Sequence, residues 1–389
     1  MERHYFDHNA TTPLAPEALE AMLPCLREIY GNASSIHDFG QKARLVTERA
    51  RRQVASLLNA KPAEIVFTSG GTESDNLAIL GVVRGAAGER KHVITSTIEH
   101  PAVLSTCKQL ESEGCDVSYL RVGGDGVVDP GDVRAALRKE TVLISIMHAN
   151  NEIGTIQPVA EIAKIAREAG VLFHSDGVQS VGKLPVDVNR LGVDLYSLSA
   201  HKIYGPKGVG ALYVRKGVKL QPVQFGGHHE RDRRPGTENV PGIAGLGAAA
   251  DLVGGTLATE STRVGALRDK LEREILARVD FATVNAGGSP RVPNTTNVCF
   301  DFVEGEAMVI GLDLRGMAVS SGAACSSGAV EPSHVLTAIG LSKERARSSM
   351  RFSLGKQNTD AEIDALIEAV PAVVGHLRKL SPARAAKLA

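Results

Sequence analysis

The sequence predicts an α/β protein with a largely parallel sheet in a larger first domain and a smaller α+β domain after it. Between about residues 60 and 215, short apolar runs alternate with amphipathic or turn-rich stretches, as strands and helices do in a parallel α/β sheet. Near residue 258 this pattern changes, and a long charged amphipathic stretch at 263–279 precedes turns rich in Pro and Gly. With 389 residues, the chain is long enough to form two domains.

The spacing of apolar residues predicts the individual elements. Short apolar runs bounded by turn residues predict strands at 65–67, 93–95, 142–147, 171–173, 195–197 and 210–214. Apolar residues at helical spacing predict a helix at 158–169 and a shorter one at 132–139. In the second region, a helix at 263–279 is followed by strands at 297–302 and 350–353.

Composition and charge argue against several classes of function. Lys plus Arg and Asp plus Glu number 44 each, so no overall field favours nucleic acid or acidic lipid. Aromatic residues are 4% with no Trp, which argues against surfaces that stack bases or sugars. The N-terminus has no apolar core of signal-peptide length, and no uncharged run is long enough to span a bilayer. We therefore expect a cytoplasmic protein without nucleic-acid or membrane partners.

The five cysteines form neither a CxxC pair nor a cluster with metal-ligand spacing. An odd number in a chain without a signal peptide indicates reduced cytosolic thiols and no metal site. Four of them lie in helix-like or strand-like stretches and are expected to be small buried hydrophobes: Cys25, Cys107, Cys115 and Cys299. Cys325 instead lies among small residues at 320–329. This stretch indicates a mobile, exposed loop whose thiol is either a nucleophile, if its surroundings favour thiolate, or an inert free thiol.

Polar residues recur just past the C-terminal ends of the predicted strands. They form clusters at 68–70, 99–100, 148–151, 174–176 and 199–202. Because ligands bind at that edge of a parallel sheet, five clusters in succession predict a functional site there.

Lys202 and Asp176 are the first candidates for chemistry at this edge. Lys202 follows an apolar strand and precedes a turn rich in Gly and Pro. Most lysines are simply solvated, but a lysine held rigidly at a strand end suits Schiff-base chemistry with pyridoxal 5'-phosphate (PLP). Asp176 ends a neighbouring strand and could keep the ring nitrogen of PLP protonated, although it could also be a helix cap. Gln179 could donate to the ring hydroxyl oxygen.

Other residues could bind the remaining parts of PLP and an amino acid. The Gly-containing stretch at 69–76 could hold a phosphate with backbone N–H groups and Thr72, although a plain helix cap would look similar. It lacks the P-loop ending and the GxGxxG pattern, so it gives little support to nucleotide binding. His100 could lie over the ring, and Asn151 could contact the ring oxygen; a packed histidine and an ordinary turn are the alternatives. Arg351 could bind a carboxylate as a bidentate fork.

Short motifs along nearly the whole chain resemble those of cysteine desulfurases of the NifS/IscS type, a group of class-V, fold-type-I PLP enzymes. They lie, in the same order, at 7–12, 67–76, 99–100, 150–154, 174–179, 199–210, 236–239, 320–329 and 351–355. The small-residue stretch around Cys325, followed by 331–336, is the motif that distinguishes a desulfurase with a long loop. The resemblance implies fold type I, with a mainly parallel seven-stranded sheet in a large PLP-binding domain at 13–258. Residues 1–12 and 259–389 would form the small domain that carries the Cys325 loop.

The resemblance also implies a role for each matching residue. Lys202 would bind PLP covalently, Asp176 would pair with the ring nitrogen, and His100 would stack on the ring as acid and base. The residues implied to contact the ring oxygen are Gln179 and Asn151. Those implied to hold the phosphate are Gly71, Thr72, Ser199 and His201, with Thr237 reaching the phosphate of a neighbouring subunit in a homodimer. Those implied to take the cysteine carboxylate are Arg351 and Asn32.

The implied reaction takes sulfur from L-cysteine, leaves L-alanine and forms a persulfide on Cys325. An acceptor protein would receive that sulfur, whether an Fe–S scaffold, a nitrogenase-dedicated system or a tRNA-thiolation enzyme. One departure is His229, where relatives usually have Gln. Two other functions remain open: a class-V aminotransferase or lyase, which would use Lys202 but not Cys325, and a catalytically silent scaffold, which would lack the Schiff-base lysine.

Overall fold

The seven-stranded sheet predicted for the larger domain is present. The structure is a computed structural model that describes residues 3–321, 323–324 and 331–380. The strands of the sheet lie in the order β2 (Ile65–Thr68), β8 (Gly210–Val214), β7 (Leu195–Ser199), β6 (Leu172–Asp176), β5 (Thr141–Ser145), β3 (His92–Ser96) and β4 (Asp116–Leu120). All neighbours are parallel except β8, which is antiparallel to both β2 and β7. The mainly parallel sheet is therefore confirmed.

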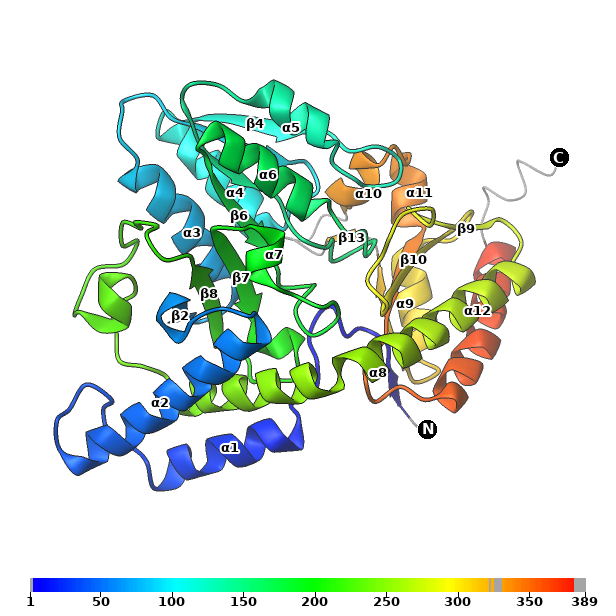
Figure 1. Cartoon of the computed structure of the whole chain (residues 1–389). Coiled ribbons are helices and arrows are strands. Elements are labelled where there is room, and N and C mark those ends of the chain that lie inside the picture. Colours follow the sequence, from blue (N-terminus) through cyan, green and yellow to red (C-terminus); the bar gives the residue numbers. More distant parts are fainter. Residues whose placement is uncertain (1–2, 322, 325–330, 381–389) are drawn as a thin grey trace.

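Helices cover both faces of this sheet (Figure 1). On one face, α3 (Gly71–Gly85) and α4 (Pro101–Ser112) bury Leu77 and Val103 against alternate strand residues such as Val66 and Leu143. On the other face lie α2 (Asp38–Leu57), α6 (Val159–Ala169), α7 (Val188–Leu191) and the first half of α8 (Val240–Arg278). Alternate strand residues thus enter two different cores, as expected for a sheet buried on both sides.

Several boundaries differ from the sequence-based expectation. The strand β4 was missed because only one of its five residues is fully buried, so this edge strand lacks the apolar run used to find the others. The strand expected at 142–147 ends at Ser145 as β5, whereas β6 and β7 extend to Asp176 and Ser199. The helix expected at 132–139 is α5 (Pro130–Ala136), because Asp129 caps it by accepting a hydrogen bond from the Gly131 N–H.

The helix α8 connects the two regions of the chain. It was expected only from residue 263, but it is 39 residues long and runs through the predicted domain boundary at 258. Its first half packs on α1 (Pro16–Arg27) and α2, and its second half packs on α12 (Asp360–Leu380). By length and composition α8 could cross a membrane, but 56% of its most apolar window is buried inside the fold, as in a core helix.

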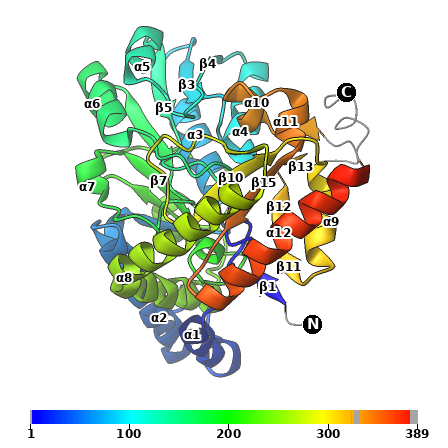
Figure 2. The same ribbon diagram turned by 90° about the vertical axis from the view of Figure 1, so that its right-hand side faces the viewer.

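The second region contains an antiparallel sheet in the order β12 (Ser320–Ser321), β15 (Ser349–Ser353), β10 (Thr295–Phe300) and β9 (Ala282–Val284) (Figure 2). Its core includes residues of α8, α9 (Gly305–Asp313) and α12. The N-terminal strand β1 (His4–Tyr5) joins this region by pairing with β11 (Met317–Ala318). The remaining short elements are α10 (His334–Ala338), α11 (Lys343–Arg347), and β13 (Ala323–Ala324) paired with β14 (Glu331–Pro332).

Candidate active site

A cavity of about 350 Å³ lies at the C-terminal ends of β6 and β7, within the range of about 300–1,000 Å³ that is usual for small-molecule sites. The predicted residues that line it are Gly71, Thr72, His100, Asn151, Asp176, Gln179, Ser199, His201, Lys202 and Arg351. These residues lie far apart in the chain, and the fold brings them to one edge of the large sheet, as the polar clusters after the strands predicted.

Lys202 lies in the short 3₁₀ turn Ala200–Lys202 directly after β7. Its Nζ donates hydrogen bonds to the backbone oxygens of Asn9 and Ala10, at 2.5 Å and 2.7 Å. Burial and the positive charge of Arg351 lower the pKa of Lys202 to about 8. A lysine with this pKa is partly a free amine near neutral pH, which is the form that can attack a carbonyl carbon.

The rate at which the cofactor-free protein captures PLP covalently should therefore rise with pH and level off above about pH 8. Below the pKa the amine is protonated and cannot attack, and above it the reactive fraction no longer increases. An unshifted lysine, with a pKa of about 10.4, would give a rate that still climbs at pH 10. Stopped-flow absorbance between pH 6 and pH 11 distinguishes these two curves.

Asp176 is the last residue of β6 and is buried at the cavity wall. Burial and the charge of Asp75 raise the pKa of Asp176 to about 6, while His100 opposes the rise. Its Oδ1 accepts the N–H of Val178 at 2.9 Å, and the residues that follow form turns. The helix-cap alternative is therefore wrong. A buried carboxylate without a strong cation is costly, and the protonated ring nitrogen of PLP would supply that cation.

Replacing Asp176 with alanine should lower the turnover rate by at least about 10²-fold, because preorganised charges at a reacting centre are typically worth that much. The matched control is Asp187→Ala, since Asp187 is a true N-cap that accepts hydrogen bonds from Asn189 and Arg190 N–H groups. The control should lose about 1 kcal/mol of stability and keep its rate. Steady-state kinetics and thermal melts measure both quantities; equal rates in the two variants would contradict the role of Asp176.

The first turn of α3 can hold a phosphate. A side chain at Gly71 would place its Cβ 2.7 Å from Val178 Cγ2, so only glycine lets the backbone lie there. The free N–H groups at the start of a helix attract an anion. His201 lies in the same cavity with Nδ1 3.1 Å from Thr11 Oγ1. Burial and Lys202 lower the pKa of His201 to about 4, and its ring nitrogens are hydrogen-bonding groups that could contact a phosphate. These residues fit PLP.

His100 caps α4, since its Nδ1 accepts the N–H of Ala102 at 3.1 Å. A ring that accepts at Nδ1 carries its proton on Nε2 when neutral. Burial lowers the pKa of His100 against the opposing charge of Asp176, and Lys202 adds to the lowering. His100 is therefore a neutral hydrogen-bond donor at the cavity wall.

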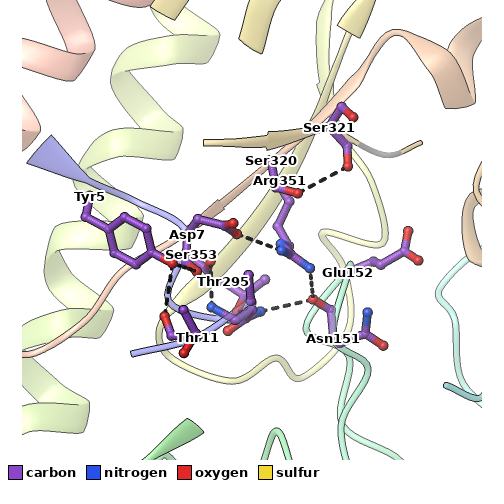
Figure 3. A network of polar contacts seen from close by, with 12 residues as sticks. Tyr5, Asp7, Thr11, Asn151, Glu152, Thr295, Ser320, Ser321, Arg351 and Ser353 are labelled. Atoms are coloured by element: carbon purple, nitrogen blue, oxygen red, sulfur yellow. Dashed lines mark hydrogen bonds and ion pairs between the residues drawn. The ribbon is translucent and has the colours of Figure 1, made fainter. Parts of the chain in front are cut away.

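Arg351, on β15, lies between Asp7 and Asn151 (Figure 3). Its Nη2 lies 2.7 Å from Asp7 Oδ1, and its Nη1 donates to the backbone oxygen of Asn151 at 3.0 Å. The Nε of Arg351 is buried and has no hydrogen-bond partner among the described residues. An unused donor on a cation that lines the cavity fits a ligand carboxylate.

Two predicted residues that the structure describes, Asn32 and Thr237, do not line this cavity. Both are exposed, so their roles stay predictions, and Cys325 lies outside the described residues. His229 has a contact in the loop of Thr237, because its Nδ1 accepts the Gly236 N–H at 3.2 Å. The four other cysteines are buried, as predicted, and burial raises the pKa of Cys107 to about 12 and of Cys115 to about 11.

Two polar residues that line the cavity were missed as site residues, Asn9 and Asp75. Asn9 belongs to the motif at 7–12, and Asp75 to the stretch at 69–76. Each missed residue therefore lies within a stretch of sequence that had already been linked to the site. Burial raises the pKa of Asp75 to about 7, and its Oδ1 lies 3.5 Å from His174 Nε2. Asp75 thus adds a second carboxyl group beside Asp176.

Known proteins share this sequence and fold. The pattern of the aminotransferase class-V family matches residues 4–366, so the chain belongs to that family, whose members depend on PLP. The chain is 50% identical over 378 residues to the cysteine desulfurase IscS of Dictyoglomus turgidum, which covers 97% of this chain and 96% of the relative. It is 50% identical over 384 residues to a cysteine desulfurase of Gluconacetobacter diazotrophicus, covering 98% and 96%. Within the family it is a cysteine desulfurase of the NifS/IscS type.

Solved structures agree with this assignment. A NifS-like protein matches with a TM-score of 0.90 and 38% identity, over 96% of this chain and all of that one (100%). A structure described as SspA in complex with cysteine matches with a TM-score of 0.81 and 41% identity, over 90% of this chain and 98% of that one. The fold-type-I prediction is therefore confirmed.

Proposed function

We propose that this cysteine desulfurase acts on free L-cysteine and releases L-alanine, with the sulfur held as a persulfide on Cys325. The observation that carries the proposal is the meeting of Lys202, Asp176 and Arg351 in one cavity: an amine, a carboxylate and a carboxylate-binding cation. The curated relatives named above are cysteine desulfurases, and one similar solved structure holds cysteine. The residues of the cavity and the related proteins both point to a small α-amino acid as the substrate.

Four side chains of the cavity have roles in this reaction. When bound, PLP supplies an electron sink for the negative charge that forms at the α-carbon of the substrate. Lys202 holds PLP and then moves the proton of the α-carbon. Asp176 keeps the ring nitrogen protonated, and Arg351 orients the substrate through its carboxylate. Neutral His100 would stack on the ring of PLP and has its Nε2–H available as a hydrogen-bond donor.

Cys325 performs the sulfur transfer. Its thiolate forms an S–S bond with the substrate sulfur while the substrate C–S bond breaks, and the electron pair of that bond stays on the carbon. Protonation of this carbon completes alanine, and the substrate sulfur remains on Cys325 as a persulfide. Cysteine and one enzyme thiol thus give alanine and one enzyme persulfide, so no outside oxidant or reductant is needed. The persulfide then passes to an acceptor protein, for which an Fe–S scaffold is our proposal, in the cytoplasm.

The active unit in this proposal is a homodimer. Large apolar side chains between residues 26 and 45 are exposed, including Tyr30 at 72% and Ile36 at 93%. The rings of Tyr30 and Phe39 lie 5.4 Å apart, so these two side chains form one exposed apolar patch. Monomers rarely expose large apolar patches, and a second copy of this chain would cover this one. Thr237, exposed in the single chain, would then contact the phosphate bound by the partner.

The experiment that tests the reaction uses the purified protein with PLP and cysteine, and no keto acid. Alanine should form, and a peptide containing Cys325 should gain the mass of one sulfur atom. Alanine that appears only when a keto acid is added would favour the aminotransferase alternative instead. A sulfur atom found on Cys25, Cys107, Cys115 or Cys299 would refute the role of Cys325.

A further inference from the structure

A second lysine, Lys183, lies behind the wall of the active-site cavity. Its Nζ donates to Asn9 Oδ1 at 3.0 Å and to Gln179 Oε1. Burial and the positive charges of Lys202 and Arg351 lower the pKa of Lys183 well below its usual range. Burying an amine is costly unless it is hydrogen-bonded, and the two amide oxygens compensate for that cost. Lys183 lines a separate small cavity of about 40 Å³, which it shares with Lys202.

Two contacts, one of them with Lys183, determine which way the oxygen and the nitrogen of the Gln179 amide point. The Nε2 of Gln179 donates to the backbone oxygen of Asn9 at 3.0 Å, and its Oε1 accepts from Lys183. A primary amide keeps nearly the same shape when it turns by 180°, so its hydrogen-bond partners decide the orientation. The backbone oxygen of Asn9 requires an N–H, and the Lys183 amine donates to an oxygen, so both partners select the same orientation of the amide. One N–H of Gln179 then remains for a ligand in the cavity.

The same amine also fixes Asn9. The Oδ1 of Asn9 accepts from Lys183 and from Asn294 Nδ2, both at 3.0 Å. Its Nδ2 donates to the backbone oxygen of Asn151 at 3.1 Å, and its backbone oxygen accepts from Lys202. Lys183 therefore contacts two residues of the cavity wall: Gln179, which is itself assigned to the ring oxygen, and Asn9, which contacts Asn151 and Lys202.

We propose that Lys183 is a positioning residue for PLP: it holds Gln179 so that an amide N–H faces the ring oxygen. The proposal rests on the role of Gln179 in the proposed function. Without Lys183, only the backbone oxygen of Asn9 still selects this orientation. The amide then turns its oxygen toward the cavity more often, where that oxygen would repel the oxygen of the ring. Lys183 does not line the active-site cavity, so it acts through Gln179 rather than on the cofactor.

The test measures the affinity of the cofactor-free protein for PLP by equilibrium titration. Lys183→Met removes the amine but keeps an unbranched side chain. It should weaken binding by about 10-fold, because it leaves the buried oxygen of Gln179 without its hydrogen bond. The matched control is Lys356→Met. Lys356 lines the same small cavity, but its amine lies over the ring of Tyr204, 5.1 Å from the centroid. The control should change the affinity by less than about twofold.

A double-mutant cycle separates positioning from a general structural role. If Lys183 acts through Gln179, then Lys183→Met should cost less than about twofold in a protein that already carries Gln179→Leu. Lys183→Gln keeps N–H donors and should lose less affinity than the Met variant; it also serves if the Met variant does not fold. Equal losses from Lys183→Met with and without Gln179, equal losses from Met and Gln, or no loss at all would overturn the proposal.

These affinities do not depend on desulfuration. If the wild-type protein binds PLP but releases no alanine from cysteine, then the proposed function fails while the role of Lys183 can still be measured. If Gln179→Leu leaves the affinity unchanged, the role of Gln179 fails and the positioning role of Lys183 fails with it.

Discussion

Replacing Lys202 by alanine is expected to abolish the release of alanine from cysteine, with a loss of at least about 10⁴-fold. Two functions disappear together, because Lys202 is both the covalent anchor of PLP and the group that moves the proton of the substrate α-carbon. PLP should then be removable by dialysis. Absorbance before and after dialysis and alanine release under saturating cysteine measure both effects.

The matched control is Lys207→Ala. Lys207 belongs to the same Gly- and Pro-rich turn but is exposed, so its loss should leave both PLP retention and turnover within about twofold of wild type. Unchanged turnover in Lys202→Ala would refute Lys202 as the anchor. Equal losses of PLP retention and turnover in both variants would show that these properties depend on the turn and not on the Lys202 amine.

Cys325→Ser should separate the binding of cysteine from the cleavage of its C–S bond. Lys202, Asp176 and His100 do not need this thiol, so the variant should bind PLP and change its visible spectrum when cysteine is added. A serine hydroxyl at neutral pH is a far weaker nucleophile toward sulfur than a thiolate. Alanine release should fall to background, and no persulfide should be trapped.

Selective alkylation supplies the control for Cys325. In the absence of cysteine, Cys325 should react quickly with an alkylating reagent, while the four buried cysteines should react slowly. In Cys325→Ser the fast phase should disappear. If this variant still forms alanine at a rate near that of wild type, then the proposed sulfur transfer is wrong and an aminotransferase or lyase reaction becomes the better explanation.

The elements of the fold that can be predicted are those that are buried and therefore show a run of apolar residues in the sequence. The central strands β5 to β7 are covered on both faces, so their positions could be found from runs of apolar residues alone. The edge strand β4 has one solvated side and was missed, and the first half of α8 was missed because Gly and Ala at 242–255 show no helical spacing of large residues. In both cases the neighbouring elements, rather than the local sequence, stabilise the structure.

The predictable part of the site is the edge of the large sheet. Lys202, Asp176 and His100 follow strands, and parallel strands place their C-terminal ends together. The contacts of Asn9 with Gln179, Lys183 and Lys202 follow no such rule. They depend on the return of the N-terminal segment across the cavity, and no periodicity in residues 3–12 indicates where that segment lies.

The pairing of the two ends of the chain has a consequence for how the protein is made. Asp7 is synthesised 344 positions before its partner Arg351, and β1 likewise precedes its partner strand β11. At about 5–20 residues per second, this separation corresponds to roughly 20–70 s of translation. The large sheet can form during that time, but β1 has no partner strand and Arg351 does not yet line the cavity. The ribosome must pass residue 351 before the pocket is complete, so the nascent protein cannot bind its ligands with the full set of cavity residues until then.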